Sequence, residues 1–299
     1  MSSASSGPST NTTAALPDPL PLLTNGARPM HYDDLNVSRE NGVTTITINR
    51  PEKHNALRQQ TFAELGAAVA AAGADKETRV IVLTAAGSRI FCSGIDLEAD
   101  GLPATTEEWD DHTKGNADVI RSIWYCDKPV ITALNGGAIA GGCNLAMVGD
   151  LTIAADTAFL SEPEIRHGAL SPLLMLPWLM SFKGFNELYL TGDRLDAARA
   201  REVGLVNYVV APEDLAREAQ RLAERVANAP MYALTLAKRA VRLTLDIQGF
   251  KAAQDAHRYI DTILLGSQGV VEKERIMAVL AEDGMGAFLR ARDTPYGER

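Results

Sequence analysis

Cysteine is scarce in this 299-residue chain, which limits the covalent and metal-bound structures that it can form. The three cysteines, Cys92, Cys126 and Cys143, are odd in number, far apart and without the paired spacing of metal ligands. We therefore expect neither a disulfide framework nor a metal site. Unpaired thiols are typical of a reducing compartment, so the sequence indicates a cytoplasmic protein.

The chain also has fewer basic than acidic residues. The chain has 29 Lys and Arg residues against 38 Asp and Glu residues, which gives a net charge of -9. An acidic surface repels nucleic acids and anionic membranes, so neither is expected as a partner. An anionic ligand would have to be held by a local cluster of basic side chains.

The N-terminal segment lacks the features of a signal peptide. Residues 1–30 are rich in Ser, Thr, Ala and Pro, and they contain no Lys or Arg before Arg28. A signal peptide needs a basic start followed by a continuous apolar stretch. We predict instead that residues 1–30 form a disordered tail.

An uninterrupted apolar run of membrane-spanning length is missing as well. From Pro129 to Gly149 the chain carries no charged residue, and this length is enough to span a membrane. However, Asn135, Asn144 and four glycines interrupt it, and its first part is β-branched. The pattern predicts a strand, a turn and a buried helix rather than a membrane span.

The predicted elements alternate between strands and helices through the first two thirds of the chain. Asn41-Gly42 predicts a hairpin over residues 35–48, and Asn55 is placed to cap a helix that runs to Gly73. A polar segment over residues 98–111 is predicted to be a surface loop that leads into a helix ending at Tyr125. Short apolar runs predict buried strands over residues 80–83, 130–134, 151–154 and 206–210. This alternation is typical of an α/β fold with parallel strands.

The last third of the chain has a different character. Residues 213–227, 231–245 and 250–264 have helical apolar spacing and no strand signal. We therefore divide the chain into a tail (1–30), an α/β core (31–212) and a C-terminal helical region (213–299).

Two glycine-containing turns follow predicted strands. They span Phe91–Leu97 and Asn135–Asn144. Glycine lets the backbone approach a ligand closely, and a helix that begins at such a turn leaves its first N–H groups unpaired, so each turn can bind an oxyanion. Tight packing is the simpler explanation for a single turn. A dinucleotide site is set aside because the segment from Gly136 to Gly141 does not match G-x-G-x-x-G.

Five motifs in order along the chain together indicate a family. They are Arg50-Pro51 with Lys53 and Asn55-Ala56-Leu57, then Phe91–Leu97, then Lys128-Pro129 leading to Gly141-Gly142-Cys143, then Pro163-Glu164-Ile165, then Gly204-Leu205-Val206. From about Tyr32 to its C-terminus the chain resembles the crotonase (enoyl-CoA hydratase/isomerase) superfamily.

The resemblance implies a fold, an assembly and a binding site. The fold would be a spiral of ββα units with a C-terminal helical region, in a homotrimer or a homohexamer. The substrate would be an acyl-CoA thioester, and no cofactor would be needed beyond the coenzyme A that it carries. The family's oxyanion hole maps onto the backbone N–H groups of Ile95 and Gly141. The remaining residues implied to contact coenzyme A or the acyl group are Lys53, Ala56, Leu57, Ser93, Asp96, Leu97, Gly142 and Leu170.

The sequence departs from the typical hydratase at one catalytic position. Two glutamates of the hydratase pattern map onto Asn144 and Glu164, so only Glu164 is a carboxylate. Asn144 can orient water or a substrate oxygen, but it cannot carry a proton as an acid or base. Bulky apolar residues from Gly168 to Trp178, where the family often has glycines, indicate a reshaped acyl pocket.

The sequence is compatible with three functions. The first is hydration or dehydration of an enoyl-CoA, with or without cleavage of a carbon–carbon bond. The second is isomerisation of a Δ3 to a Δ2 double bond with Glu164 as the single proton shuttle. The third is a non-catalytic acyl-CoA-binding paralogue.

Several neighbouring side chains are expected to have lesser roles. Glu162 would share a strand face with Glu164 and contact the pocket if the segment were extended. His167 is expected to be a pocket-wall or surface residue. Asp96 and Asp150 are expected to support the backbone, and Cys92 and Cys143 to fill the core.

Overall fold

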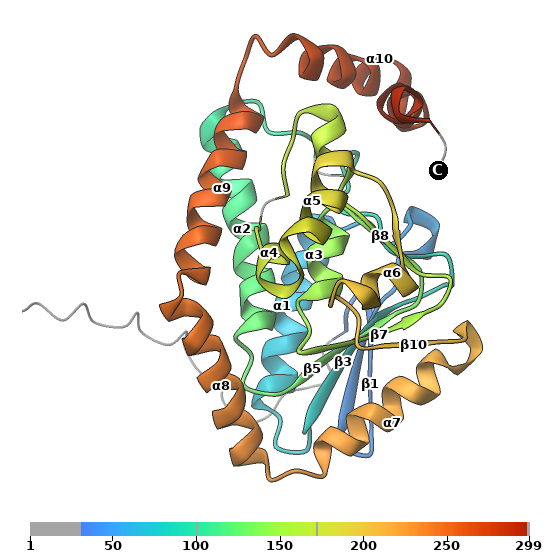
Figure 1. The fold of residues 1–299 in the computed structure, drawn as a ribbon, viewed down its shortest axis with the longest axis vertical. Helices are drawn as coiled ribbons and strands as arrows, with labels where there is room; N and C mark the ends of the chain where they lie inside the picture. Colours follow the sequence, from blue (N-terminus) through green and yellow to red (C-terminus); the bar gives the residue numbers. More distant parts are fainter. Residues whose placement is uncertain (1–30, 100, 172, 298–299) are drawn as a thin grey trace, which may run out of the picture. The chain divides into compact units, whose positions relative to one another are not determined.

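The strands form two sheets whose members alternate along the chain (Figure 1). This computed structural model describes residues 31–99, 101–171 and 173–297, of which those from Tyr32 onward form one unit. The predicted tail over residues 1–30 lies outside the described residues. The sheets have the strand orders β1-β2-β3-β5-β7-β10 and β4-β6-β8-β9.

The six-stranded sheet begins with the predicted hairpin. β1 (Leu35–Glu40) and β2 (Val43–Ile48) pair antiparallel, and the turn residues Asn41 and Gly42 both have positive φ angles. Such a turn matches the twist of the paired strands. The next strands, β3 (Val80–Ala85), β5 (Val130–Leu134), β7 (Leu151–Ala155) and β10 (Tyr208–Val210), are all parallel to β2.

Helices on both faces bury the parallel strands. α7 (Leu215–Ala227) packs on β2, β3, β5 and β7, whereas α1 (Gln59–Ala74) packs on β1 and β2. α2 (Thr106–Trp124) lies against α1, and α9 (Phe250–Gly266) lies against α2, as Figure 1 shows. This burial explains why β3 and β5 are continuous apolar runs rather than alternating patterns.

The second sheet is built from short strands that follow those of the first. β4 (Ile90–Cys92) follows β3, β6 (Gly137–Ile139) follows β5, and β8 (Phe159–Ser161) follows β7, while β9 (Leu195–Asp196) closes the far edge. β4, β6 and β8 are parallel neighbours, so their carboxyl ends lie together at one edge. This repeated ββα unit agrees with the predicted spiral.

The remaining helices are short in the core and long at the C-terminus. The core contains α3 (Gly141–Met147), α4 (Leu176–Leu179), α5 (Phe182–Thr191), α6 (Ala197–Glu202) and the 3-10 turns η1 (Pro51–Lys53), η2 (Pro163–His167) and η3 (Pro212–Asp214). The C-terminal region adds α8 (Met231–Ile247), α10 (Val271–Asp293) and η4 (Thr294–Tyr296). α10 lies in the predicted C-terminal helical region, but its bounds were not predicted because its apolar spacing is weak.

Two local predictions were wrong. Asn55 does not cap a helix: it has a φ of 53°, and its side chain accepts a hydrogen bond from the Arg50 N–H and donates to Ala86 and Ile90. α1 begins four residues later, at Gln59. The predicted loop over residues 98–111 ends earlier than expected, because Thr105 and Glu108 form a capping box that starts α2 at Thr106.

No helix in the described part of the chain combines the length and the apolar character needed to cross a membrane. The uncharged stretch from Pro129 to Gly149 forms β5, β6 and α3, as the interrupted pattern predicted.

Candidate active site

Three segments that carry the predicted chemistry meet at the carboxyl edge of the second sheet. Ile95 follows β4, Gly141 follows β6, and Glu164 follows β8. Because β4, β6 and β8 are adjacent and parallel, residues that leave their carboxyl ends are brought side by side. Residues about 70 positions apart therefore build one site from three short connections.

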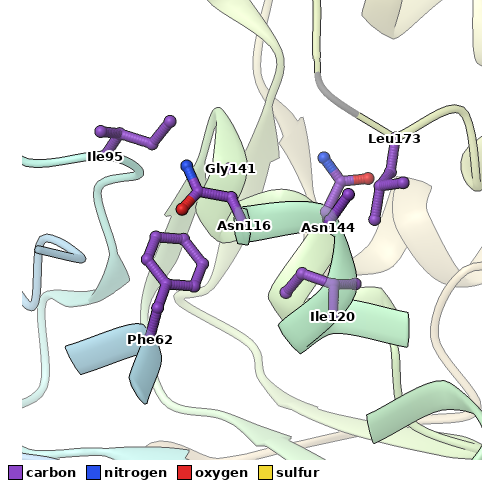
Figure 2. Close-up of a pocket in the computed structure, with 8 residues that line it drawn as sticks. Phe62, Ile95, Asn116, Ile120, Gly141, Asn144 and Leu173 are labelled. Carbon is purple, nitrogen blue, oxygen red and sulfur yellow. The ribbon is translucent and has the colours of Figure 1, made fainter. Parts of the chain in front are cut away.

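The first turn directs the Ile95 N–H away from its strand partner. The Leu57 N–H donates to the Gly94 carbonyl at 2.8 Å, and the Asp96 N–H donates to the Leu57 carbonyl at 3.0 Å. Backbone groups of an extended chain alternate in direction, so the N–H of Ile95 points to the opposite side. Ile95 lines a narrow pocket (Figure 2), and we infer that its N–H faces this pocket.

The second turn presents the Gly141 N–H beside the first. Gly141 begins α3, so its N–H has no partner within the helix. Ala140, just before it, has φ 56° and ψ -131°, a strained conformation for a residue with a side chain. Its N–H donates to the Ser161 carbonyl at 2.9 Å, which ties this turn to β8.

Two glycines let these turns touch. A Cβ added to Gly94 would lie 2.9 Å from the Cβ of Ala140 and 3.3 Å from the N of Gly141. A Cβ added to Gly142 would lie 2.3 Å from the carbonyl oxygen of Cys92. The glycines of the two motifs are therefore needed for close approach, and Ile95 and Gly141 line one pocket.

The Arg50-to-Leu57 motif supports the first turn from behind. The buried Arg50 guanidinium pairs with Asp96 at 3.0 Å and donates to the Ala56 carbonyl. Asp96 also accepts hydrogen bonds from the N–H groups of Glu98 and Ala99. The Asp96 carboxylate is thus occupied by the protein itself, as expected for a residue that supports the backbone.

Glu164 lies in η2 with only 8% of its surface exposed. Burial raises the pKa of its carboxyl to about 7, because an ionised carboxylate loses hydration there. Arg292 of α10 opposes this shift electrostatically. One carboxyl oxygen, Oε2, has no hydrogen-bond partner among the described residues. A carboxyl with this pKa can both accept and release a proton near neutral pH.

Glu162 is a second buried carboxyl at the site. The segment is not extended as supposed, because β8 ends at Ser161 and Glu162 immediately precedes η2. The side chain is nevertheless only 1% exposed, and its carboxyl lies close to that of Glu164. Burial, followed by the nearby charge of Glu164, raises the pKa of Glu162 well above its ordinary value. Burial therefore favours the neutral form of Glu162.

Asn144 lies on α3 with 1% of its surface exposed. Its Nδ2 donates to the Ser171 hydroxyl, whereas its Oδ1 has no partner in the described structure. The Ser171 carbonyl accepts a hydrogen bond from His257 of α9. Sequence reasoning missed Ser171 and His257, because nothing in their local patterns indicates that α9 holds the segment after η2.

Leu170 is anchored from the same helix. Its backbone N–H donates to the Asp261 carboxyl at 3.1 Å, and Asp261 is only 1% exposed. Burial raises the pKa of Asp261 to about 7, and the charge of Glu164 adds to the shift. The site thus has a third buried carboxyl, contributed by the C-terminal region.

A narrow pocket opens between the two turns and α2 (Figure 2). Its lining combines Ile95, Gly141 and Asn144, which were predicted, with residues that were not, namely Phe62, Asn116, Ala117, Ile120 and Leu173. The missed residues come from α1, α2 and the segment after η2, where apolar spacing is indistinguishable from ordinary core packing. Leu173 lies within the bulky apolar segment that indicated a reshaped pocket.

The other predicted contact residues have varied settings. Lys53 is exposed and pairs with Glu98 at 3.7 Å, so its ammonium can reach solvent-borne ligands. Ala56, Leu57 and Gly142 are buried, and Ser93 and Leu97 are half-buried.

The described cysteines and histidines add no further nucleophile or metal site. Burial raises the pKa of the Cys92 thiol to about 12, and that of Cys143 also rises well above its ordinary value. His167 packs edge-on against Phe288, and burial lowers its pKa to about 4. Within the described residues, no group of three or more His, Cys, Asp and Glu side chains is arranged to hold a metal ion.

Comparison with known proteins identifies the family. A family profile described as enoyl-CoA hydratase/isomerase matches residues 38–299. A crotonyl-CoA hydratase of Syntrophomonas wolfei is 31% identical over 89% of this chain and 99% of its own, and a carnitinyl-CoA dehydratase of Escherichia coli is 32% identical over the same shares. The crystal structure of an enoyl-CoA hydratase/isomerase from Xanthobacter autotrophicus is 35% identical, covers 90% of this chain and 100% of its own, and has a TM-score of 0.86. The chain therefore belongs to the enoyl-CoA hydratase/isomerase family, the crotonase superfamily.

Proposed function

We propose that this protein is an enoyl-CoA hydratase-type lyase, which adds water to, or removes it from, an acyl-CoA thioester. The observation that carries the proposal is the meeting of three groups at one sheet edge: the Ile95 and Gly141 N–H groups and the buried carboxyl of Glu164. An oxyanion cradle beside a proton carrier is the arrangement that enolate chemistry requires.

The proposed reaction begins with the thioester oxygen accepting hydrogen bonds from Ile95 and Gly141. Glu164 takes a proton from water as the water oxygen bonds to the β-carbon. The electron pair of the double bond moves to the α-carbon and the thioester oxygen, which gives an enolate. Glu164 then returns its proton to the α-carbon, so all atoms of water enter the product. Two preorganised N–H donors stabilise the enolate by several kcal/mol, about 3 kcal/mol for each donor.

Asn144 is proposed to orient the attacking water. Its Oδ1 is a buried acceptor without a partner in the described structure, and its Nδ2 is fixed by Ser171. The amide oxygen can therefore accept a hydrogen bond from the water, but the amide cannot supply a proton to the reaction. In this scheme the same carboxyl removes and delivers the proton, and Glu162 stays protonated beside it. The proposed reaction needs the residues of this chain, the acyl-CoA and water.

Replacement of Glu164 tests the proposal. Glu164→Gln should abolish hydration of a short enoyl-CoA while binding of the thioester persists, because the amide keeps the shape but cannot carry the proton. Glu77→Gln, an exposed acid outside the site, is the control and should keep full activity. Turnover in H₂¹⁸O should place one labelled oxygen in the product and remove the enone absorbance.

The same assay separates the alternatives. A β,γ-unsaturated thioester that gains enone absorbance without taking up labelled oxygen would establish isomerisation in place of hydration. Binding without turnover on a panel of aliphatic, cyclic and aromatic enoyl-CoA thioesters would establish the non-catalytic alternative. Activity retained in Glu164→Gln would show that another group carries the proton.

We also propose that the protein is a homo-oligomer, either a trimer or a hexamer. Large apolar side chains on α8 and α9 are exposed in the single chain, namely Tyr232, Val241, Leu243, Ile247, Tyr259, Ile260 and Ile263. Exposed apolar area of this kind is typical of a surface that another chain covers.

The three free cysteines support the proposed cytoplasmic location.

A further inference from the structure

Asn116 is a buried polar residue whose environment leaves it unsatisfied. It lies on α2 with 2% of its surface exposed, and neither Nδ2 nor Oδ1 has a hydrogen-bond partner among the residues described. In Figure 2 its amide points away from Asn144, toward the side of the pocket that Ile95 and Phe62 line. The amide is therefore directed at the space that the acyl group would occupy.

Two other buried polar residues of this protein make hydrogen bonds within the chain. Thr113, one helical turn earlier on α2, hydrogen-bonds to Thr262 of α9 at 2.9 Å. Asn55 uses its Oδ1 and Nδ2 in three hydrogen bonds. An asparagine that makes none is thus a local exception, and a buried amide without partners is destabilising unless a ligand or solvent completes it.

The other lining residues limit the kinds of acyl substituent that the pocket can bind. Phe62, Ala117, Ile120 and Leu173 are buried and apolar, and none of the described lining residues is charged. A charged acyl substituent would lose its hydration here without gaining a counter-charge. A purely aliphatic chain would leave the amide unpaired. A neutral group that donates and accepts hydrogen bonds suits both atoms of the amide.

We propose that Asn116 makes this protein selective for acyl-CoA substrates whose acyl chain carries a neutral hydrogen-bonding group, of which a hydroxyl is the simplest. The inference rests on the proposed function, since it assumes that an acyl chain enters the pocket from the Ile95 and Gly141 cradle. It specifies the class of acyl group that the proposed enzyme would prefer.

Binding of unreactive saturated thioesters tests the inference apart from catalysis. Hexanoyl-CoA and its 4-, 5- and 6-hydroxy derivatives would be compared by calorimetric titration. We expect at least one hydroxy derivative to bind about tenfold to a hundredfold more tightly than hexanoyl-CoA, the range for one buried polar pair. A derivative with a terminal carboxylate should bind more weakly than hexanoyl-CoA.

Asn116→Leu provides the decisive comparison, because leucine has a similar volume and no polar atom. The variant should lose the preference for the hydroxy derivative and bind hexanoyl-CoA more tightly than the wild type does. Ile120→Val, which trims the same pocket without removing a polar group, should affect both ligands alike. Thermal unfolding of Asn116→Leu should occur at or above the wild-type temperature, since a buried unpaired amide has been removed.

The outcomes distinguish this inference from the proposed function. Equal affinity of the wild type for all four thioesters, or an equal change for all of them in Asn116→Leu, would overturn the role of Asn116 alone. Selective binding without hydration of the corresponding enoyl-CoA would overturn the proposed reaction and leave the selectivity in place. If the wild type binds none of the thioesters, both fail.

Discussion

Replacement of Glu164 by glutamine should make the protein more stable at alkaline pH while it destroys activity. The reason is the burial of the carboxyl, which raises its pKa from 4.5 to about 7. Each tenfold change in proton affinity corresponds to about 1.4 kcal/mol, so keeping Glu164 ionised inside the fold costs about 3 kcal/mol. Glutamine is neutral at every pH and avoids this cost.

The pH window of the effect follows from the direction of the shift. Below pH 4.5 the carboxyl is protonated in both the folded and the unfolded chain, so stability is unaffected. As the pH rises from 4.5 to about 7, the unfolded chain releases the proton while the folded chain retains it, and the wild type loses stability. Above about pH 7 the carboxyl is ionised in both states, so the stability of the wild type falls no further.

Thermal unfolding of the wild type and of Glu164→Gln at equal protein concentration measures the difference. The two melting temperatures should nearly coincide at pH 4.5. At pH 8 the variant should melt about 6–12 °C higher, since 1 kcal/mol corresponds to about 2–4 °C in a chain of this size. The exposed Glu77→Gln should show no such dependence. An equal difference at both pH values would refute the reasoning, because it would show that burial does not raise the pKa of the Glu164 carboxyl.

Two further predictions concern the groups around Glu164. Glu162→Leu should move the acidic limb of the kcat/KM profile above pH 7, because a side-chain hydrogen bond with Glu162 lowers the pKa of Glu164. Glu162→Gln, which keeps a hydrogen-bond donor, should leave the limb in place, and identical profiles for both variants would contradict this. Gly94→Ala should reduce kcat by about a hundredfold without moving the profile, since its Cβ would press on Ala140 beside the oxyanion cradle. Gly101→Ala, with a similar positive φ and open space around it, is the control, and an equal loss there would assign the effect to backbone strain.

The sequence predicted best where local pattern decides the structure. The Asn41-Gly42 hairpin, the apolar strands β3 and β5 and the helices α7 to α9 were placed close to their observed bounds, because turn chemistry and apolar spacing are local properties. Asn55 was assigned as a cap for the same reason, and wrongly, since its three partners lie on segments up to 35 residues away. Local spacing cannot reveal such a partner.

The residues of the candidate site were likewise predicted from the sequence only in part. The turns of Ile95 and Gly141 were predicted from ordered motifs, and the structure brings them to one pocket, although their catalytic roles stay predictions. Glu162 was considered on the assumption of an extended strand, but its burial arises from the fold of η2. Asn116 and Ser171 carry no signal in the sequence, because only tertiary packing places them beside Asn144. Division of the chain at residues 30 and 212 likewise stays a prediction.

The construction of the site from three strand ends has a consequence for how its chemistry can diverge. Each connection is only a few residues long and leaves a different strand, while the six-stranded sheet and its covering helices hold the strands in place. A substitution in one connection can change one chemical group without altering the positions of the other two. The sequence motifs predict that Asn144, in the helix that follows β6, stands where a typical hydratase has an acid, which would be an exchange of this kind. Such a scaffold allows the group that moves the proton to change while the proposed thioester cradle is kept.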